Sequence, residues 1–368
     1  MVRMGYCASL LVRILRDPLQ VRGLLPLQWD CLIRQARHAN LLGRLYHFMD
    51  TAGVLDEVPA APRNHLISGH YLAQRQVFSV CHEVDALRAA LQAEDIPLIL
   101  LKGAAYSAAG LPAGAGRVFA DMDILVPHDV LDVAEAALMK SGWATTSLSA
   151  YDQQYYRRWM HELPPMQHLV RGVVLDVHHT ILPPTARYHP DPVRLVADRV
   201  PVAGFEAVYT LSPVDMVLHA ATHLFHEGES DNALRDISDL DILLRYFSSC
   251  SGDAFWDNLV KRAVAQQLMY PLWLALHFSV RVFLTPVPGG VQSDLVKYAP
   301  TGRMRYWLEW MYDEIFQPQH VTVETKYTAL ARRVLYIRGH WLRMPARLLV
   351  MHLLRKAVLP EKPPARPE

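Results

Sequence analysis

Apolar positions at helical spacing dominate the first quarter of the chain. They recur at three- and four-residue steps in two stretches: Leu32, Ile33, Ala36 and Leu41, then Val80, Val84, Leu87 and Leu91. This spacing places the apolar side chains on one face of a helix. We therefore predict an N-terminal helical lobe over residues 1–95.

Short continuous apolar runs replace the helical spacing after residue 95. The runs Leu98–Leu101 and Met122–Val126 are each followed by a turn-forming residue, Gly103 and Pro127. Buried strands that end at turns have this pattern. The stretch 129–140 then returns to helical spacing. We expect two strands and a helix in this part of the chain.

A β-hairpin is expected next. The runs Met166–Val170 and Val173–Val177 are separated by Arg171-Gly172. A two-residue loop with Gly at its second position suits the turns of tight hairpins. Because a hairpin is antiparallel, the pattern predicts a mixed sheet.

These patterns together predict an α+β fold in four segments. The N-terminal helical lobe (1–95) precedes a small mixed-sheet α/β core at 96–210. Helical spacing returns after Pro213, which predicts a C-terminal helical region at 211–359. The last residues, 360–368, contain four prolines and are expected to form a disordered tail.

Composition places the chain among folded proteins. Of its 368 residues 51% are hydrophobic and 20% charged, which excludes general disorder. The four cysteines lie far apart without a CxxC pair, so we expect a reducing compartment and no cysteine zinc site. The uncharged stretch Ala263–Val280 contains Gln, Pro and His, so no transmembrane segment is predicted. No small-residue cleavage site follows the N-terminal apolar run, and we expect a cytoplasmic protein.

Charge is balanced overall but uneven along the chain. Lys and Arg number 37 against 36 Asp and Glu, yet the segment 326–356 has eight basic residues and no acidic one. The rest of the chain therefore has a net charge of −7. The basic segment could bind an anionic partner such as RNA or anionic lipid. Its apolar content favours the alternative, which is docking on the acidic remainder of the protein.

Three acidic residues are the main candidates for chemistry. Asp121 and Asp123 lie two apart on a predicted strand, so both carboxylates point to the same face. Adjacent carboxylates repel each other unless a cation such as Mg²⁺ bridges them. The alternative to a metal site, for an isolated Asp-x-Asp pair, is that one acid caps the strand and the other is solvated. Asp176, between the apolar Leu175 and Val177, adds a third carboxylate and favours a metal site.

Cations and a glycine accompany these acids. Gly103 follows the first predicted strand and lets the backbone approach a phosphate closely. Lys102 and Arg117 are close to the acids in sequence and could hold phosphate oxygens. The combination predicts phosphoryl or nucleotidyl transfer.

The order of these motifs resembles the nucleotidyltransferase superfamily typified by DNA polymerase β. More closely, three stretches are similar to an uncharacterised bacterial nucleotidyltransferase-like family with a Leu-Lys-Gly motif: Leu-Leu-Lys-Gly at 100–103, Asp-Met-Asp-Ile-Leu-Val at 121–126 and Leu-Asp-Val-His at 175–178. Arg117, four residues ahead of Asp121, and a His-rich helix before Asp236 and Asp239 belong to the same resemblance. It covers about residues 20–250.

The resemblance implies roles for individual residues. Asp121 and Asp123 would hold the Mg²⁺ or Mn²⁺ ions that bridge the phosphates of an NTP such as ATP. Asp176 would complete the metal site and activate the acceptor hydroxyl, and Gly103 with Ala104 would form the phosphate turn. The expected function is therefore metal-dependent transfer of a nucleotidyl group to an acceptor that the sequence does not identify, whether small molecule, protein or RNA.

Two other functions stay open. His219, His223 and His226 fall at i, i+4 and i+7 on one predicted helical face and, with Asp236 or Asp239, could form a zinc hydrolase site. No Glu lies between them in the metalloprotease manner. Pairing with these acids, or lining the acceptor pocket, is the interpretation we favour for the histidines. The third function is that of a nucleotide-sensing binding protein with a degenerate site.

An aromatic cluster precedes the hairpin. Tyr151, Tyr155, Tyr156 and Trp159 lie within nine residues of each other. They could stack on a nucleotide base, whereas helix packing is the alternative that we favour.

Overall fold

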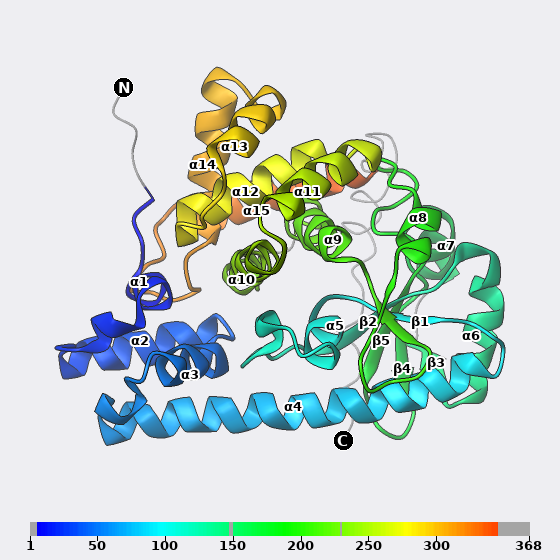
Figure 1. Cartoon of the computed structure of the whole chain (residues 1–368), viewed down its shortest axis with the longest axis horizontal. Helices are drawn as coiled ribbons and strands as arrows, with labels where there is room; N and C mark the ends of the chain where they lie inside the picture. The colour runs from blue at the N-terminus through cyan, green and yellow to red at the C-terminus, as the bar shows by residue number, and fades with distance from the viewer. Residues whose placement is uncertain (1–5, 147–149, 229, 345–368) are drawn as a thin grey trace.

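The computed structural model describes residues 6–146, 150–228 and 230–344, and Figure 1 shows their arrangement. Helices surround one seven-stranded sheet, so the predicted α+β class is confirmed. The predicted tail at 360–368 lies outside the described residues.

The first lobe is helical, as predicted. Its helices are α1 (Leu10–Arg16), α2 (Pro26–His38), α3 (Leu42–Thr51) and α4 (Ala60–Gln92). Pro26 at the first position of α2 has the backbone angle that a helix start needs. Asn40, with φ of 56°, separates α2 from α3 because a left-handed residue ends a helix.

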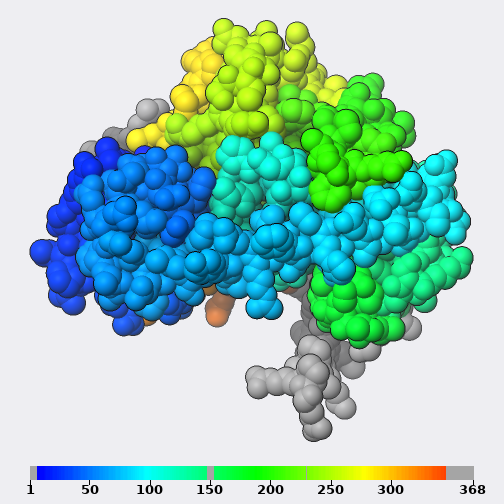
Figure 2. Space-filling view, turned by 60° about the horizontal axis from the view of Figure 1, so that its bottom comes forward, coloured from blue at the N-terminus to red at the C-terminus, as the bar shows by residue number. Residues whose placement is uncertain are grey.

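Helix α4 connects the N-terminal lobe to the sheet. It runs beneath α3 at one end and reaches β1 and α6 at the other (Figure 1). The space-filling view shows it crossing one whole face of the molecule (Figure 2). The apolar stripe expected at 80–91 is buried: Val80, Val84, Leu87 and Leu91 are at most 1% exposed. The sheet therefore packs against the end of α4 that has the regular apolar stripe.

The sheet has the order β3-β4-β5-β2-β1-β7-β6. Its strands are β1 (Leu98–Leu100), β2 (Asp121–Leu125), β3 (Trp143–Thr145), β4 (Met166–His168), β5 (Val174–His178), β6 (Val200–Pro201) and β7 (Val208–Thr210). The pairs β2–β5 and β1–β7 are parallel and the other four pairs are antiparallel. The sheet is mixed, as the hairpin predicts.

The hairpin itself is confirmed, but its predicted two-residue loop is wrong. Strands β4 and β5 pair antiparallel, and residues 169–173 lie between them. The His168 carbonyl and N–H close this loop by bonding Gly172 and Val173. Arg171 forms an ion pair with Glu83 of α4 at 2.6 Å, which holds the loop against that helix. This long-range pair has no signature in the local sequence.

The remaining helices cover the sheet and build the second half of the molecule. They are α5 (Lys102–Ala108), α6 (Leu131–Lys140), α7 (Ala150–Trp159), α8 (Pro192–Ala197), α9 (Pro213–His226), α10 (Ala233–Ser251), α11 (Asp253–Ala265), α12 (Met269–Phe283), α13 (Gly289–Leu295), α14 (Gly302–Ile315) and α15 (Thr328–Arg343). Helix α9 lies at their centre and contacts α10, α11, α12 and α15. Buried apolar residues from Leu11 to Leu335 form one continuous core.

Helix α15 contains the described part of the basic segment. It packs on α9 and α14, and Gly339 lies so close to Gly228 that a Cβ there would be 2.7 Å from the Gly228 Cα. Arg338 donates to the Phe225 carbonyl at 2.9 Å. Intramolecular docking of the basic segment is thus confirmed for residues 328–343. Residues 345–356 lie outside the described structure, and an anionic partner for them stays a prediction.

None of the helices in the described ranges has both the length and the apolar character that crossing a membrane requires.

Candidate active site

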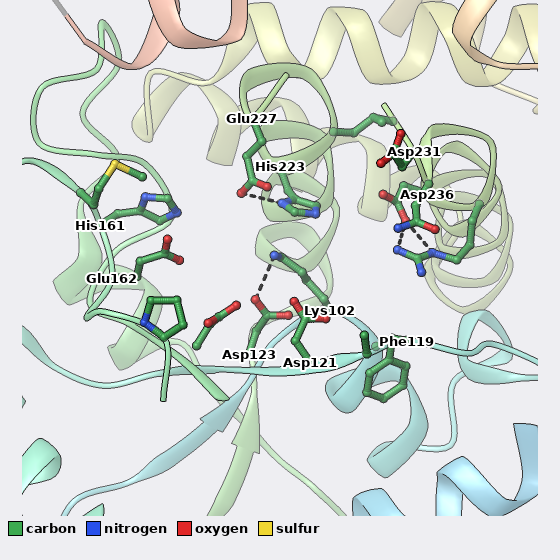
Figure 3. Close-up of a pocket in the computed structure, with 18 of the residues that line it drawn as sticks. Lys102, Phe119, Asp121, Asp123, His161, Glu162, His223, Glu227, Asp231 and Asp236 are labelled. Carbon is green, nitrogen blue, oxygen red and sulfur yellow. Dashed lines mark hydrogen bonds and ion pairs between the residues drawn. The ribbon is translucent and has the colours of Figure 1, made fainter. Parts of the chain in front are cut away.

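A pocket of about 790 Å³ opens between the sheet and the C-terminal helices. Residues of β2, β5, α5, α9, α10 and α15 line it. Figure 3 shows acidic side chains along its floor and a second group of charged side chains on the wall next to α10. The two groups differ in how their charges are balanced.

The parallel pairing of β2 and β5 brings the three predicted carboxylates together. Asp123 lies directly opposite Asp176 in the register, and Asp121 shares the face of Asp123 because residues two apart on a strand point the same way. All three line the pocket. The expected juxtaposition of these residues is therefore present.

Lys102 provides a cation at this carboxylate cluster. Its Nζ lies 2.9 Å from Oδ1 of Asp123, and both side chains are largely buried. Lys102 has a φ of 46° where β1 passes into α5, a left-handed conformation that is strained for a side-chain-bearing residue. Burial disfavours the charged forms, but the mutual attraction prevails: the pKa of Asp123 is held well below its usual value and that of Lys102 is raised. The pair is therefore ionised at neutral pH.

The other carboxylates of the cluster are not compensated in this way. Burial, together with the charges of Asp123 and Asp121, raises the pKa of Asp176 to about 8. Oδ1 of Asp176 is buried without a hydrogen-bond partner within the described structure. An orphaned oxygen and a surplus of negative charge fit a divalent cation held by oxygen ligands. Oxygen donors of this kind suit Mg²⁺ or Mn²⁺, but the ligand atoms of Asp121, Asp123 and Asp176 do not all lie within 4.8 Å of one another in the described structure.

Glu162 and Glu227 are acidic residues of the pocket that the sequence analysis did not predict. Glu162 follows α7 in an irregular segment and joins β5 through a single bridge to His178, so no periodic pattern marks it. Glu227 caps the end of α9, with Oε1 at 2.6 Å from Nδ1 of His223. The i, i+4 spacing of His223 and Glu227 in the sequence could have indicated this pair. Burial, Asp176 and Glu227 raise the pKa of Glu162 well above its usual value.

The residues expected at the phosphates have different environments. Lys102 and Gly103 line the pocket, whereas Ala104 is not among its lining residues and is 1% exposed. Gly103 lies inside α5, where a Cβ would meet the Arg117 guanidinium at 2.1 Å. This glycine is therefore required for packing against Arg117, whatever its role toward phosphate.

Arg117 lies on the pocket wall within an arginine cluster. Its Nε donates to Oδ2 of Asp239 at 2.8 Å, and Arg44 reaches Oδ1 of the same carboxylate at 2.7 Å. Arg235 pairs with Asp236 at 2.9 Å. The cations outweigh burial, so the pKa of Asp239 is lowered. We call Arg44, Arg117, Arg235, Asp236 and Asp239 the arginine cluster.

The structure does not assemble the histidine site expected on α9. The predicted pairing of these histidines with Asp236 or Asp239 is wrong, because both acids are bound to arginines. His223 pairs with Glu227 and lines the pocket, while His226 packs edge-on against Tyr188. The arrangement thus offers no support for the zinc hydrolase interpretation on α9.

The aromatic cluster lies partly in the pocket. Tyr155 and Tyr156 line it, and the Tyr155 ring contacts those of Tyr156 and Trp159 edge-on. The side chain of Tyr151 lies outside the described structure. Stacking on a base stays a prediction for the two lining tyrosines.

Comparison with known proteins bears on this geometry. Residues 26–283 match the model of a protein family described as uncharacterised nucleotidyltransferase. The matched range contains the carboxylate cluster and the arginine cluster and ends before α14 and α15. No curated protein and no solved structure matches the chain.

Proposed function

Because the chain belongs to this family of uncharacterised nucleotidyltransferases, we propose that it moves a nucleotidyl group from an NTP to an acceptor hydroxyl in a metal-dependent reaction. The observation that carries the proposal is the register of β2 and β5, which sets Asp123 opposite Asp176 with Asp121 on the same face. Three carboxylates at the floor of one pocket are a suitable ligand set for Mg²⁺ or Mn²⁺.

We assign the metal to Asp121, Asp123 and Asp176. When bound, it neutralises phosphate charge and aligns the attacking oxygen with the phosphorus atom. Asp176, with a pKa of about 8 before metal binds, is the group that accepts the proton of the acceptor hydroxyl. The acceptor oxygen forms a bond to the α-phosphorus while the bond to the departing pyrophosphate breaks.

The chain's cations hold the donor. Lys102 extends into the pocket beside the metal ligands, and we propose that its amine leaves Asp123 for a phosphate oxygen when metal and NTP bind. Gly103, which lines the pocket, places the start of α5 beside the same phosphates. We also assign Arg117 to the nucleotide side of the pocket, where its bonds to Asp239 keep it in place.

The test is incubation of the full chain with each labelled NTP and Mg²⁺ or Mn²⁺, followed by a search for label on small molecules, RNA and protein. We expect transfer by the wild type and a loss of at least about 100-fold in Asp123→Asn, since a metal ligand is removed. Asp231→Asn is the matched control, because Asp231 lies in the same pocket outside the carboxylate cluster. Full activity of a folded Asp123→Asn variant would overturn the assignment.

A second candidate is a nucleotide-sensing protein without transfer activity. The Lys102–Asp123 ion pair favours it, because an amine fixed on a metal-binding carboxylate competes with the metal. The same experiment separates the two: saturable NTP binding with no labelled product from any acceptor supports the sensor.

We further propose that the protein acts in the cytoplasm. Its four cysteines are all free, in keeping with a reducing compartment.

A further inference from the structure

A second group of metal-ligating side chains lies beside the carboxylate cluster. His161, Glu162 and His178 each offer one ligand atom, and these atoms lie within 4.8 Å of one another. His161 and Glu162 line the same pocket as Asp123, and Figure 3 shows them on the side away from Asp236. None of the three belongs to the metal site proposed above.

The backbone holds this group in place. The segment after α7 lies along β5: the Leu163 N–H donates to Val177 at 2.8 Å, and the His179 N–H donates to His161 at 2.9 Å. Glu162 and His178 face each other in an antiparallel bridge. The three side chains are therefore set by main-chain bonds and not by a mobile loop, as a metal site requires.

The polar atoms of the group lack partners. His161 and His178 are only 4% and 2% exposed, and Nδ1 of each is buried without a hydrogen bond inside the described ranges. The Glu162 carboxylate comes no closer than 3.4 Å to Nδ1 of His178. Buried polar atoms are normally satisfied, so orphaned nitrogens within a group of clustered ligand residues indicate a missing ligand.

The contact of His178 with Asp123 explains which nitrogen is free. Nε2 of His178 lies 3.0 Å from Oδ1 of Asp123, and the ionised carboxylate accepts a hydrogen bond from it. In the neutral ring this leaves an unprotonated Nδ1 directed at the Glu162 carboxylate. Nδ1 of His178 and the Glu162 carboxylate oxygen each have a lone pair that a cation between them can accept.

A doubly protonated His178 would also satisfy both acids. It would leave Nδ1 of His161 without a partner, however, because that atom needs a donor or an acceptor of its own. A metal ion satisfies all three side chains together.

We propose that His161, Glu162 and His178 bind a divalent transition-metal ion of the zinc class, separate from the Mg²⁺ or Mn²⁺ site of the aspartates. Two imidazoles and one carboxylate select such ions over Mg²⁺, which prefers oxygen ligands and water. Three protein ligands would leave a coordination position open, and two of the three residues line the pocket.

This ion would act on the carboxylate cluster through His178. With the metal on Nδ1, the ring must keep its proton on Nε2 and donate it to Asp123, the carboxylate–histidine–metal arrangement common in metal sites. His178 is then a positioning residue that fixes Asp123. The inference rests on the ligand geometry alone and does not depend on nucleotidyl transfer.

The test uses the full chain without a histidine tag, stripped of metal with a chelator and kept in excess Mg²⁺. We expect it to bind about one Co²⁺ per chain, with visible absorption bands that Zn²⁺ abolishes by displacement. His161→Gln and Glu162→Gln should each weaken Co²⁺ binding at least about tenfold. His223→Gln is the matched control, since it removes a pocket histidine outside the group and should leave the bands unchanged.

X-ray absorption of the Zn²⁺-loaded wild type tests the ligands without any variant. Two imidazole nitrogens and a carboxylate oxygen in the first shell are expected. An all-oxygen shell, no Co²⁺ binding in excess Mg²⁺, or equal loss in His223→Gln and His161→Gln would each overturn the proposal. If the variants do not fold, the absorption spectrum of the wild type alone decides.

Discussion

Behind the pocket wall Asp239 has an arginine within 2.8 Å of each oxygen, whereas in the carboxylate cluster Oδ1 of Asp176 is buried without a hydrogen-bond partner among the described residues. The two carboxylates respond in opposite ways. The pKa of Asp239 is lowered despite burial, because Arg117 and Arg44 attract its charge. The pKa of Asp176 is raised to about 8 by burial and by its acidic neighbours. Burial is common to both, so the supply of cations makes the difference.

The comparison separates scaffold from site. In the arginine cluster Arg44 also donates to the Ala113 carbonyl and to Ser238, so it fastens α3 to the turn after α5 and to α10. Both acids of this cluster are paired with arginines of the protein itself. The carboxylate cluster has a surplus of negative charge, which costs stability in the metal-free protein and makes a cation a favourable ligand.

The largest effect on stability is expected from a substitution in the arginine cluster. Asp239→Asn leaves two buried arginines without their carboxylate, and we expect it to lower the free energy of unfolding by about 3–5 kcal/mol. Urea unfolding followed by circular dichroism measures the loss. Asp231→Asn, at an exposed position, should change it by less than about 0.5 kcal/mol. Equal stability of the two variants would contradict the scaffold role.

The next largest effect is expected for Lys102, the cation at the carboxylate cluster. Lys102→Ala should weaken nucleotide binding by about 1.5–3 kcal/mol, because a charged hydrogen bond to phosphate is lost. Metal binding should persist, since Asp123 is released from its amine. Calorimetry with each nucleotide measures both. Arg117→Ala is the informative contrast: it removes a partner of Asp239 and should reduce stability first. Wild-type nucleotide affinity in Lys102→Ala would rule out its contact with phosphate.

A smaller effect of opposite sign is expected at Asp176. Its pKa is about 8 in the folded protein against an ordinary 3.8, so between these values the folded state retains a proton that the unfolded state has lost. The metal-free protein should therefore lose stability as the pH rises from 4 to 8. Asp176→Asn removes this dependence and should stabilise the protein by about 1–2 kcal/mol at pH 8 and hardly at all at pH 4.

The measurement is urea unfolding in chelator at both pH values, with Asp123→Asn as the control. Asp123 is paired with Lys102 and has a lowered pKa, so its variant should be less stable than the wild type. A stability gain in Asp123→Asn with none in Asp176→Asn would reverse the picture of the carboxylate cluster.

The smallest effect on stability is expected for Arg235, whose partner Asp236 has a second arginine nearby. Arg235→Gln removes one of three cations that face two acids, and Asp236 still has Arg117 at 3.7 Å. We expect a loss of about 1 kcal/mol in the same urea assay. A loss as large as that of Asp239→Asn would mean that all three arginines are needed, and that the cluster has no spare cation.

Local patterns predicted the floor of the site well. The strand period of two put Asp121 and Asp123 on one face, and an acid between apolar neighbours marked Asp176. These signals lie within a few residues. Both strands were predicted, but their parallel pairing, which sets Asp123 opposite Asp176, was not.

The walls of the site could not be predicted because their contacts span the chain. Arg117 and Asp239 are 122 residues apart, and no periodicity links them. Glu162 owes its position to a single bridge with His178 in an irregular segment. The sequence pointed to the histidines of α9, but the acids predicted as their partners, Asp236 and Asp239, pair with arginines instead. Competition between partners is a property of the fold and is invisible in spacing.

Helix α15 has a consequence for how such a protein diversifies. It supplies Tyr336, His340 and Arg343 to the pocket wall, yet it lies beyond residues 26–283, which match the family. The carboxylate cluster and part of the pocket wall are therefore encoded in separate stretches. A gene could exchange the second stretch while keeping the first, which would change the pocket wall and leave the carboxylate cluster unaltered. Any such exchange would have to preserve the close packing of Gly339 against Gly228.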